Sequence, residues 1–200
     1  MDKNKSLLLL LIAGLGISAF IALFQLSHMG KGGAESSIVT PNFGGPFTLT
    51  DQTGKTVTEK DFEGRYRLIY FGFTFCPAIC PTELAKMAET LKRLGEKAEK
   101  ITPIFITIDP ERDTKEAMAE YVTLFHPRLI GLTGTPEQIA QAAKGYKVYY
   151  AKVEDPSLSE YTMDHSSYIY FMGPDNTLLA LYKSGDTAEK IAADIEKKLN

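Results

Sequence analysis

The chain has 200 residues, 44% of them hydrophobic and 24% charged, with a formal net charge of −3. Residues 1–28 carry a net charge of +1 from Asp2, Lys3 and Lys5, so the rest of the chain carries −4. A mildly acidic domain lacks the basic surface that nucleic-acid binding requires, and we exclude that class of function. The length suits one domain with a sizeable core.

An uncharged segment, residues 6–26, predicts a membrane anchor. About 20 apolar residues span the ~30 Å hydrocarbon core of a bilayer. A cleaved signal peptide has a shorter apolar region and a small-residue cleavage site, which Ser27-His28-Met29-Gly30 does not resemble. Positive charge favours the cytoplasmic side, and Lys3 and Lys5 precede the run. We therefore predict that residues 1–28 are a cytoplasmic stub and a single transmembrane helix.

The short stub leaves no room for an Arg-rich mitochondrial presequence. This favours a bacterial inner membrane, with the C-terminal part in the periplasm.

The segment after the anchor, residues 29–46, contains five glycines and two prolines, which is typical of a flexible tether. We expect the folded domain to occupy residues 47–200. Its first elements are a hairpin over 47–58 with Gly54 in the turn and a buried strand over 65–75. An amphipathic helix over 82–97 follows, with Pro81 in its first turn.

The second half alternates in the same way. The expected elements are a strand over 102–108, a helix capped by Asp113 and running to about 125, a helix from Thr135 to about 144, strands over 148–153, 167–172 and 178–182, and a helix over 187–199. Residues 173–176 form the turn of a strand hairpin. Parallel β-α-β units followed by an antiparallel hairpin predict an α/β fold. The order is that of a thioredoxin-like mixed sheet flanked by helices, here with an N-terminal β-hairpin extension and an N-terminal transmembrane helix.

The two cysteines of the chain, Cys76 and Cys80, lie where the predicted strand gives way to the predicted helix. A helix N-terminus stabilises a thiolate and lowers its pKa. If these residues are helical, positions i and i+4 present both sulfurs on one face. Structural disulfides normally close longer loops. We therefore interpret the pair as a chemically active site.

The spacing of the pair leaves two chemistries open. Thioredoxin-like redox enzymes use C-x-x-C, whereas three residues separate the cysteines here. Two neighbouring thiolates also chelate a soft metal ion. A third ligand would decide between a metal site and a redox site.

The chain has three histidines to supply that ligand. His28 lies at the membrane border and is incidental, and His126 follows a predicted helix, where an imidazolium interacts favourably with the helix dipole. His165 precedes the strand predicted over 167–172, which packs beside the cysteine-bearing turn in a thioredoxin-like fold. A Cys₂His set suits copper(I) and also holds copper(II), with zinc as the competitor. By position alone, His165 fits an ordinary loop histidine equally well.

Four further side chains have possible supporting roles. Asp164 and Asp109 are candidates to hydrogen-bond the far nitrogen of His165, although an aspartate more often caps a turn. Met87 and Met163 offer thioether sulfurs to copper(I). Met87 occupies a core position of its predicted helix, which leaves Met163 as the candidate auxiliary ligand.

Several segments match one known family in the same order. They are Gly44-Gly-Pro-Phe47, LIYFGFTFCPAICPTELAKM (68–87), FITIDPERDTKEA (105–117), GLTGT (131–135), Asp164-His165 and Gly173-Pro-Asp175. Together they resemble the Sco/SenC proteins, copper-binding assembly factors for cytochrome c oxidase. The resemblance covers residues 44–199.

The resemblance implies a thioredoxin fold, a membrane anchor and one copper ion bound by Cys76, Cys80 and His165. It also implies a role in maturing the dinuclear copper centre of cytochrome c oxidase subunit II. The protein would either deliver copper or act as a thiol–disulfide oxidoreductase on the cysteines of that subunit, with other copper chaperones or thiol reductants as further partners. Redox defence or sensing is a related alternative. The family usually has an acidic residue at the position of Ala78, so this chain lacks one negative charge beside the site.

Overall fold

The computed structural model describes residues 43–154 and 160–199. The predicted anchor and most of the predicted tether lie outside these residues. In the described ranges, every helix is too short or too polar to cross a bilayer. Residues 43–46, at the end of the predicted tether, already contact the folded part: the Gly44 N–H donates to the Gly145 carbonyl at 3.0 Å, and the Phe43 ring packs on Tyr170.

A seven-stranded mixed sheet forms the centre of the fold, in the order β2-β1-β5-β4-β3-β8-β9. Its strands are β1 (Thr48–Asp51), β2 (Thr56–Thr58), β3 (Tyr66–Gly72), β4 (Ile101–Thr107), β5 (Ile130–Thr133), β8 (Tyr168–Met172) and β9 (Leu178–Lys183). β3, β4 and β5 are parallel, whereas β8 and β9 are antiparallel additions. Every residue of β3 and β4 is buried, which explains their continuous apolar sequences.

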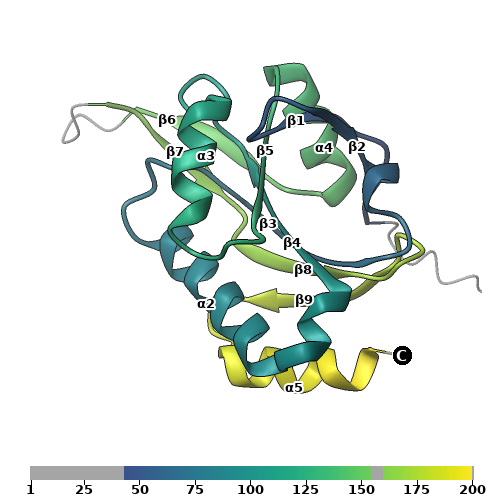
Figure 1. Ribbon diagram of the computed structural model, residues 1–200. Coiled ribbons are helices and arrows are strands. Elements are labelled where there is room, and N and C mark those ends of the chain that lie inside the picture. The colour runs from purple at the N-terminus through teal and green to yellow at the C-terminus, as the bar shows by residue number, and fades with distance from the viewer. Residues whose placement is uncertain (1–42, 155–159, 200) are drawn as a thin grey trace, which may run out of the picture. The chain divides into compact units, whose positions relative to one another are not determined.

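Helices cover both faces of this sheet. They are α2 (Ile79–Leu94), α3 (Lys115–Thr123), α4 (Pro136–Tyr146) and α5 (Ala188–Lys198), together with the 3₁₀ helices η1 (Glu59–Phe62) and η2 (Gly95–Lys100). On one face of β3, Tyr70 contacts Cys80 of α2; on the other, Phe71 packs against Tyr146 of α4 with ring centroids 5.3 Å apart. Figure 1 shows α2 and α5 together on one side of the sheet and α4 on the other.

The predicted N-terminal hairpin is built from β1 and β2, whose turn contains Gly54 with φ of +90°. A positive φ is easily adopted only by glycine. β1 also pairs with β5, so the hairpin forms one edge of the main sheet. β5 was not predicted from the sequence. Its Gly131 lets α3 approach closely, because a Cβ there would lie 2.9 Å from a methyl carbon of Val122.

A second, two-stranded sheet lies at the edge of the fold. It pairs β6 (Tyr150–Val153) with β7 (Thr162–His165), and Tyr150 is opposite His165 in the register. The sequence predicted a strand close to β6 but none at β7, because the residues TMDH show no clear apolar alternation. β7 therefore depends on its partner strand. It holds His165 in regular structure, where the sequence predicted a loop.

Of the predicted starts of α4 and α3, the first is confirmed and the second is wrong. Thr135 caps α4 as predicted, since its hydroxyl accepts the Gln138 N–H. α3 is capped by Thr114, and the prediction for Asp113 is wrong. The Asp113 carboxylate is instead fully buried, so it needs hydrogen-bond donors. Thr74, through its N–H and hydroxyl, and the Thr107 hydroxyl supply them.

Candidate metal centre

The two cysteines lie on either side of the start of α2. Cys76 belongs to the loop that follows β3, whereas Cys80 is the second residue of the helix. The condition for both sulfurs to share one helical face, that both residues are helical, is therefore not met. Instead, the Cys80 N–H donates to the Cys76 sulfur at 3.3 Å, so that this sulfur satisfies one of the unpaired N–H groups of the helix start. Cys80 is buried and Cys76 is half-buried.

His165 reaches this pair from the small second sheet. Its Nε2 lies 3.6 Å from the Cys80 sulfur, and its Nδ1 lies 3.1 Å from the Ser166 carbonyl oxygen. The imidazole packs edge-on to two aromatic rings, with centroids 6.2 Å from Tyr70 and 6.0 Å from Phe73. The structure thus brings together the three side chains that the resemblance selected.

The two thiols are not equivalent. Several contacts together lower the pKa of Cys76 to about 3. The largest is the hydrogen bond that the Cys80 thiol donates to the Cys76 sulfur; His165 and the N–H groups of Cys80 and Ala78 contribute as well, against the opposing effect of burial. The same hydrogen bond and deep burial raise the pKa of Cys80. This hydrogen bond therefore favours the thiolate at Cys76 and the thiol at Cys80.

The separation of the donors fits a shared metal ion. Bonds of ~2.3 Å to sulfur and ~2.0 Å to nitrogen place two ligands of one tetrahedral ion about 3.5 Å apart. The Cys80–His165 distance of 3.6 Å is close to that value. Within residues 43–154 and 160–199, however, no three His, Cys, Asp or Glu side chains are already arranged as a metal site. The ligand set Cys76, Cys80 and His165 therefore stays a prediction.

The two predicted supporting carboxylates lie elsewhere. Asp109 binds Arg112 and accepts the Tyr161 hydroxyl at 2.7 Å. Asp164 is exposed on β7, where successive side chains alternate, so it points away from the side of His165. Among the described residues, neither carboxylate is hydrogen-bonded to His165, whose far nitrogen faces a backbone carbonyl. The structure therefore gives no support to either candidate as a carboxylate partner of His165.

The two methionines that were candidate copper ligands lie in different surroundings. Met87 is buried in the core, as its helical position predicted. Met163 shares the His165 side of β7 and lines a hollow beside Asp109 and Tyr150.

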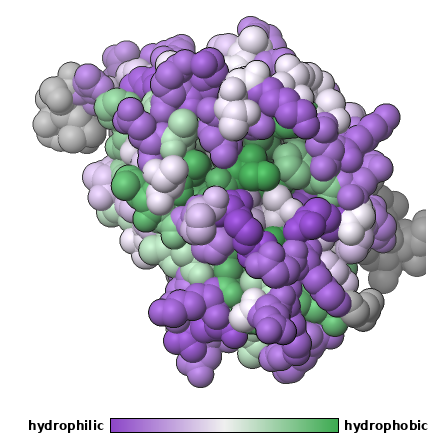
Figure 2. Space-filling model, in the orientation of Figure 1, coloured by the Kyte–Doolittle hydropathy of each residue, from purple (hydrophilic) through white to green (hydrophobic). Residues whose placement is uncertain are grey.

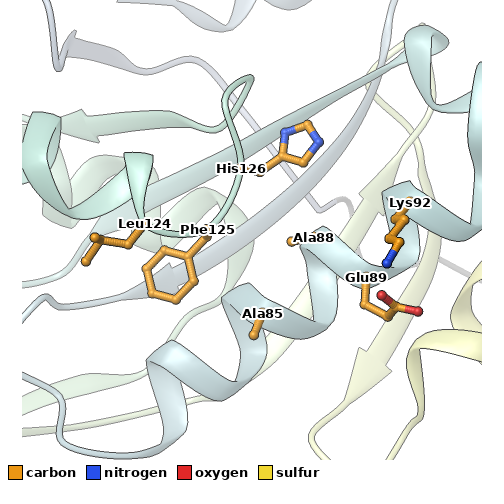
Figure 3. Close-up of a pocket in the computed structure, with 7 residues that line it drawn as sticks. All are labelled: Ala85, Ala88, Glu89, Lys92, Leu124, Phe125 and His126. Carbon is orange, nitrogen blue, oxygen red and sulfur yellow. The ribbon is translucent and has the colours of Figure 1, made fainter.

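His126 is unrelated to the cysteines. It lines a hollow between the end of α3 and α2, together with Phe125 and Ala88 (Figure 3). Burial, aided by Arg128, lowers its pKa, and its Nδ1 accepts the Arg128 N–H at 3.1 Å. The lowered pKa disfavours the imidazolium that the sequence predicted at the helix end.

Several further residues surround the site, and their contacts with it could not be predicted from the sequence. The Tyr70 hydroxyl contacts the Cys80 sulfur at 3.8 Å, and burial raises the pKa of this tyrosine. Arg112 and Asp113, in the loop between β4 and α3, contact the cysteine-bearing loop. The sequence predicted a helix cap at Asp113 and no role for Arg112, since local pattern gives no sign of these long-range contacts.

The rim of the site is apolar. The side chains on either side of Cys76 include Phe75 and Ile79, which are 56% and 45% exposed. Figure 2 shows the face of the molecule seen in Figure 1, where apolar surface lies among polar groups.

Comparison with known proteins identifies the family. A family model described as SCO1/SenC matches residues 35–200. The human mitochondrial SCO1 homolog is 46% identical over 170 residues, covering 84% of this chain and 54% of the human protein. Protein SenC of Rhodobacter capsulatus is 38% identical over 187 residues, covering 90% of this chain and 82% of SenC. The chain spans about half the length of the curated human and Arabidopsis relatives that it matches.

Solved structures agree with these relatives. Arabidopsis thaliana ScoI with copper bound matches with a TM-score of 0.74 at 43% identity, over 78% of this chain and 97% of that chain. BsSco, a member of the Sco family of cytochrome c oxidase assembly proteins in which a disulfide switch was identified, matches with a TM-score of 0.60 at 30% identity, over 78% of this chain and 93% of that chain. The predicted mixed α/β, thioredoxin-like fold is therefore confirmed. Sequence and fold together place this chain in the SCO1/SenC family.

Proposed function

We propose that this protein binds one copper ion through the sulfurs of Cys76 and Cys80 and the Nε2 atom of His165. The observation that carries the proposal is the 3.6 Å separation of His165 Nε2 and the Cys80 sulfur, which fits two ligands of one ion. Two sulfurs and one imidazole form a soft donor set that copper(I) favours. The copper-bound relative ScoI, at 43% identity, supports copper over zinc.

The protonation of the pair suits reversible binding. Cys76 is already a thiolate, so the metal displaces a proton only from Cys80. Release of the ion returns that proton, and the sulfur of the half-buried Cys76 is the more accessible donor.

Copper analysis of the reduced chain tests the ligand set. The wild-type protein and the variants Cys76→Ser, Cys80→Ser and His165→Ala are loaded with copper(I) under anaerobic conditions, and bound metal is measured. His126→Ala is the matched control, because His126 is a half-buried histidine outside the site. We expect one copper ion in the wild type and in His126→Ala. Full copper binding by His165→Ala would refute the three-ligand site.

We further propose that the protein delivers this copper during cytochrome c oxidase assembly, to the dinuclear copper centre of subunit II. The relative BsSco belongs to a family of cytochrome c oxidase assembly proteins, which supports this process. The step is tested by mixing the copper-loaded chain with the apo form of the soluble domain of subunit II. Appearance of the absorption bands of the dinuclear centre is expected. Retention of copper on this chain would refute delivery.

A membrane location completes the proposal. The uncharged residues 6–26 would anchor the protein in a bacterial inner membrane with the site in the periplasm. Alkaline phosphatase fused after residue 200 is active only outside the cytoplasm. We expect an active fusion that stays in the membrane fraction after carbonate extraction; an inactive or extractable fusion would refute this topology.

Thiol–disulfide exchange is the second candidate function, favoured by the contact between the two free cysteines. The Cys76 thiolate would attack a partner disulfide, and Cys80 would then resolve the mixed disulfide. The chain would end with a Cys76–Cys80 disulfide and the partner with two thiols, so two electrons move to the partner. The disulfide switch identified in BsSco supports this chemistry. Rapid reduction of oxidised subunit II by metal-free His165→Ala would favour this function over copper delivery.

A further inference from the structure

The loop Asp109–Asp113 contributes no predicted metal ligand, yet it contacts both halves of the candidate site. On the cysteine side, the Asp113 carboxylate accepts the Thr74 N–H at 3.0 Å and the Thr74 hydroxyl. Thr74 lies two residues before Cys76. The loop is therefore bonded to the segment that carries the first cysteine.

Arg112 of this loop joins that segment to the strand of His165. Its guanidinium carbon lies 3.7 Å from the centroid of the Tyr161 ring and 4.7 Å from that of the Phe75 ring. Phe75 directly precedes Cys76, and Tyr161 directly precedes β7, which ends at His165. One side chain thus contacts the residues next to both structural parts of the site.

Hydrogen bonds fix this arrangement at the Tyr161 end. Arg112 Nη1 donates to the Tyr161 carbonyl at 2.9 Å, while Arg112 Nε binds the Asp109 carboxylate. The Tyr161 hydroxyl donates to the same carboxylate at 2.7 Å. Arg112 is only 13% exposed, so these contacts are shielded from water. Tyr161 is therefore held by its ring, its hydroxyl and its carbonyl.

The same guanidinium also lies 5.9 Å from the centroid of Phe73, whose ring packs edge-on to the imidazole of His165. Arginine cannot itself bind a cation as a ligand, because its guanidinium is permanently protonated and has no free lone pair. Arg112 can therefore affect the site only through the residues that it contacts or through its charge.

We propose that Arg112 is a positioning residue that sets the separation between the cysteine pair and His165. It does so by stacking between Phe75 and Tyr161 while bonded to Asp109. The consequence for copper rests on the function proposed above, whereas the consequence for the position of His165 does not. A simple ion pair with Asp109 is the competing explanation. The variant Arg112→Lys distinguishes the two explanations. Lysine keeps the positive charge, but it lacks the planar guanidinium that stacks on aromatic rings and donates several hydrogen bonds at once.

The first test measures the position of His165 without metal. Nuclear Overhauser effects (NOEs) from the His165 ring to the Phe73 and Tyr70 rings are recorded on the reduced, copper-free full chain. We expect these signals in the wild type and their loss in Arg112→Lys and Arg112→Met. Arg128→Met is the matched control: Arg128 also donates to backbone carbonyls, of Ala98 and Ile101, but has no recorded contact with the site among the described residues.

A second variant covers the case in which an Arg112 variant does not fold. Tyr161→Leu removes the stack from the opposite side and leaves Arg112 in place, and we expect it to lose the same signals. Unchanged NOEs in a folded Arg112→Lys or Tyr161→Leu chain would overturn the proposal.

The second test measures copper affinity by competition with a copper(I) chelator. Loss of an outer partner of a metal ligand typically costs about 10- to 100-fold in affinity, and we expect a loss of that size in Arg112→Lys. In a His165→Ala background the same change should have no further effect, since its target is gone. An equal loss in both backgrounds would overturn the proposal. If the wild type binds no copper, the proposed function fails, and the NOE test still decides the role of Arg112.

Discussion

The imidazole of His165 lies 3.6 Å from the sulfur of Cys80, although 85 residues separate the two in the chain. The contact depends on three elements: β3, which leads into the cysteine loop, α2, which carries Cys80, and β7, which carries His165. Tyr70 and Phe73 both pack against the imidazole and restrict its position. A donor held in this way needs little rearrangement to share a metal ion with the sulfur.

Replacing His165 by alanine is expected to weaken copper(I) binding by more than the 10- to 100-fold typical of losing an outer partner, because a direct ligand is removed. The folded state should be retained, since His165 is only partly buried. Competition with a copper(I) chelator measures the affinity, and thermal unfolding monitors the fold. His126→Ala should match the wild type in copper affinity. Equal affinities for the two variants would contradict the role of His165.

Cys76 is expected to react as a thiolate throughout the neutral and weakly acidic range. Because its pKa is about 3 in the folded chain, alkylation of Cys76 by iodoacetamide should be nearly independent of pH from ~5 to ~8. In urea the same thiol returns to its ordinary pKa of about 8.5, and its rate should rise ~10-fold per pH unit. Mass spectrometry of quenched samples measures both rates. A steep pH dependence in the folded chain would contradict the predicted protonation of the pair.

Gly72 is expected to be intolerant of a side chain. A Cβ at this position would lie 2.7 Å from the Cys80 sulfur and 2.9 Å from a ring carbon of Tyr70. Overpacking of this kind costs about 1–3 kcal/mol, and it would also displace Cys80 from His165. Gly72→Ala should therefore lower both the free energy of unfolding and the copper affinity. Gly185→Ala is the control, since a Cβ there meets nothing within 4 Å; similar losses in both variants would show that crowding at Cys80 is not the cause.

The buried ion pair in the first turns of α2 is expected to matter for stability. Lys86 Nζ lies 2.8 and 3.0 Å from the carboxylate oxygens of Glu83, whose side chain is 1% exposed. Lys86→Met would leave that carboxylate buried without its partner, at a cost of about 3–5 kcal/mol. Urea unfolding measures this cost.

The exposed pair Arg93–Glu89 on the same helix provides the control for that measurement. Its side chains are 45% and 42% exposed, so Glu89→Gln should change stability by only about 0–1 kcal/mol. If the two variants lose the same stability, burial does not strengthen the Glu83–Lys86 pair.

Elements whose cause is local could be predicted from the sequence. β3 and β4 are buried on both faces, so their continuous apolar runs identify them directly. α4 begins where Thr135 and Gln138 form a reciprocal cap, which depends on residues three apart. The turn at Gly54 follows from a backbone conformation that glycine adopts readily.

Elements that depend on distant partners were missed or misplaced. β7 exists because β6 pairs with it, and β5 because β1 and β4 border it. The sequence predicted a helix cap at Asp113. Its buried carboxylate instead accepts hydrogen bonds from Thr74 and Thr107, and Thr114 caps α3.

By itself, the sequence determined that two thiols lie at a junction between a buried strand and a helix, because spacing and apolar pattern are local properties. It also carried enough family motifs to name His165. Three further features follow from the tertiary structure alone: the contact of His165 with Cys80, the hydrogen bond between the two thiols, and the position of Arg112 between the two halves of the site. These features depend on strand register and on contacts across the fold, which no local pattern encodes.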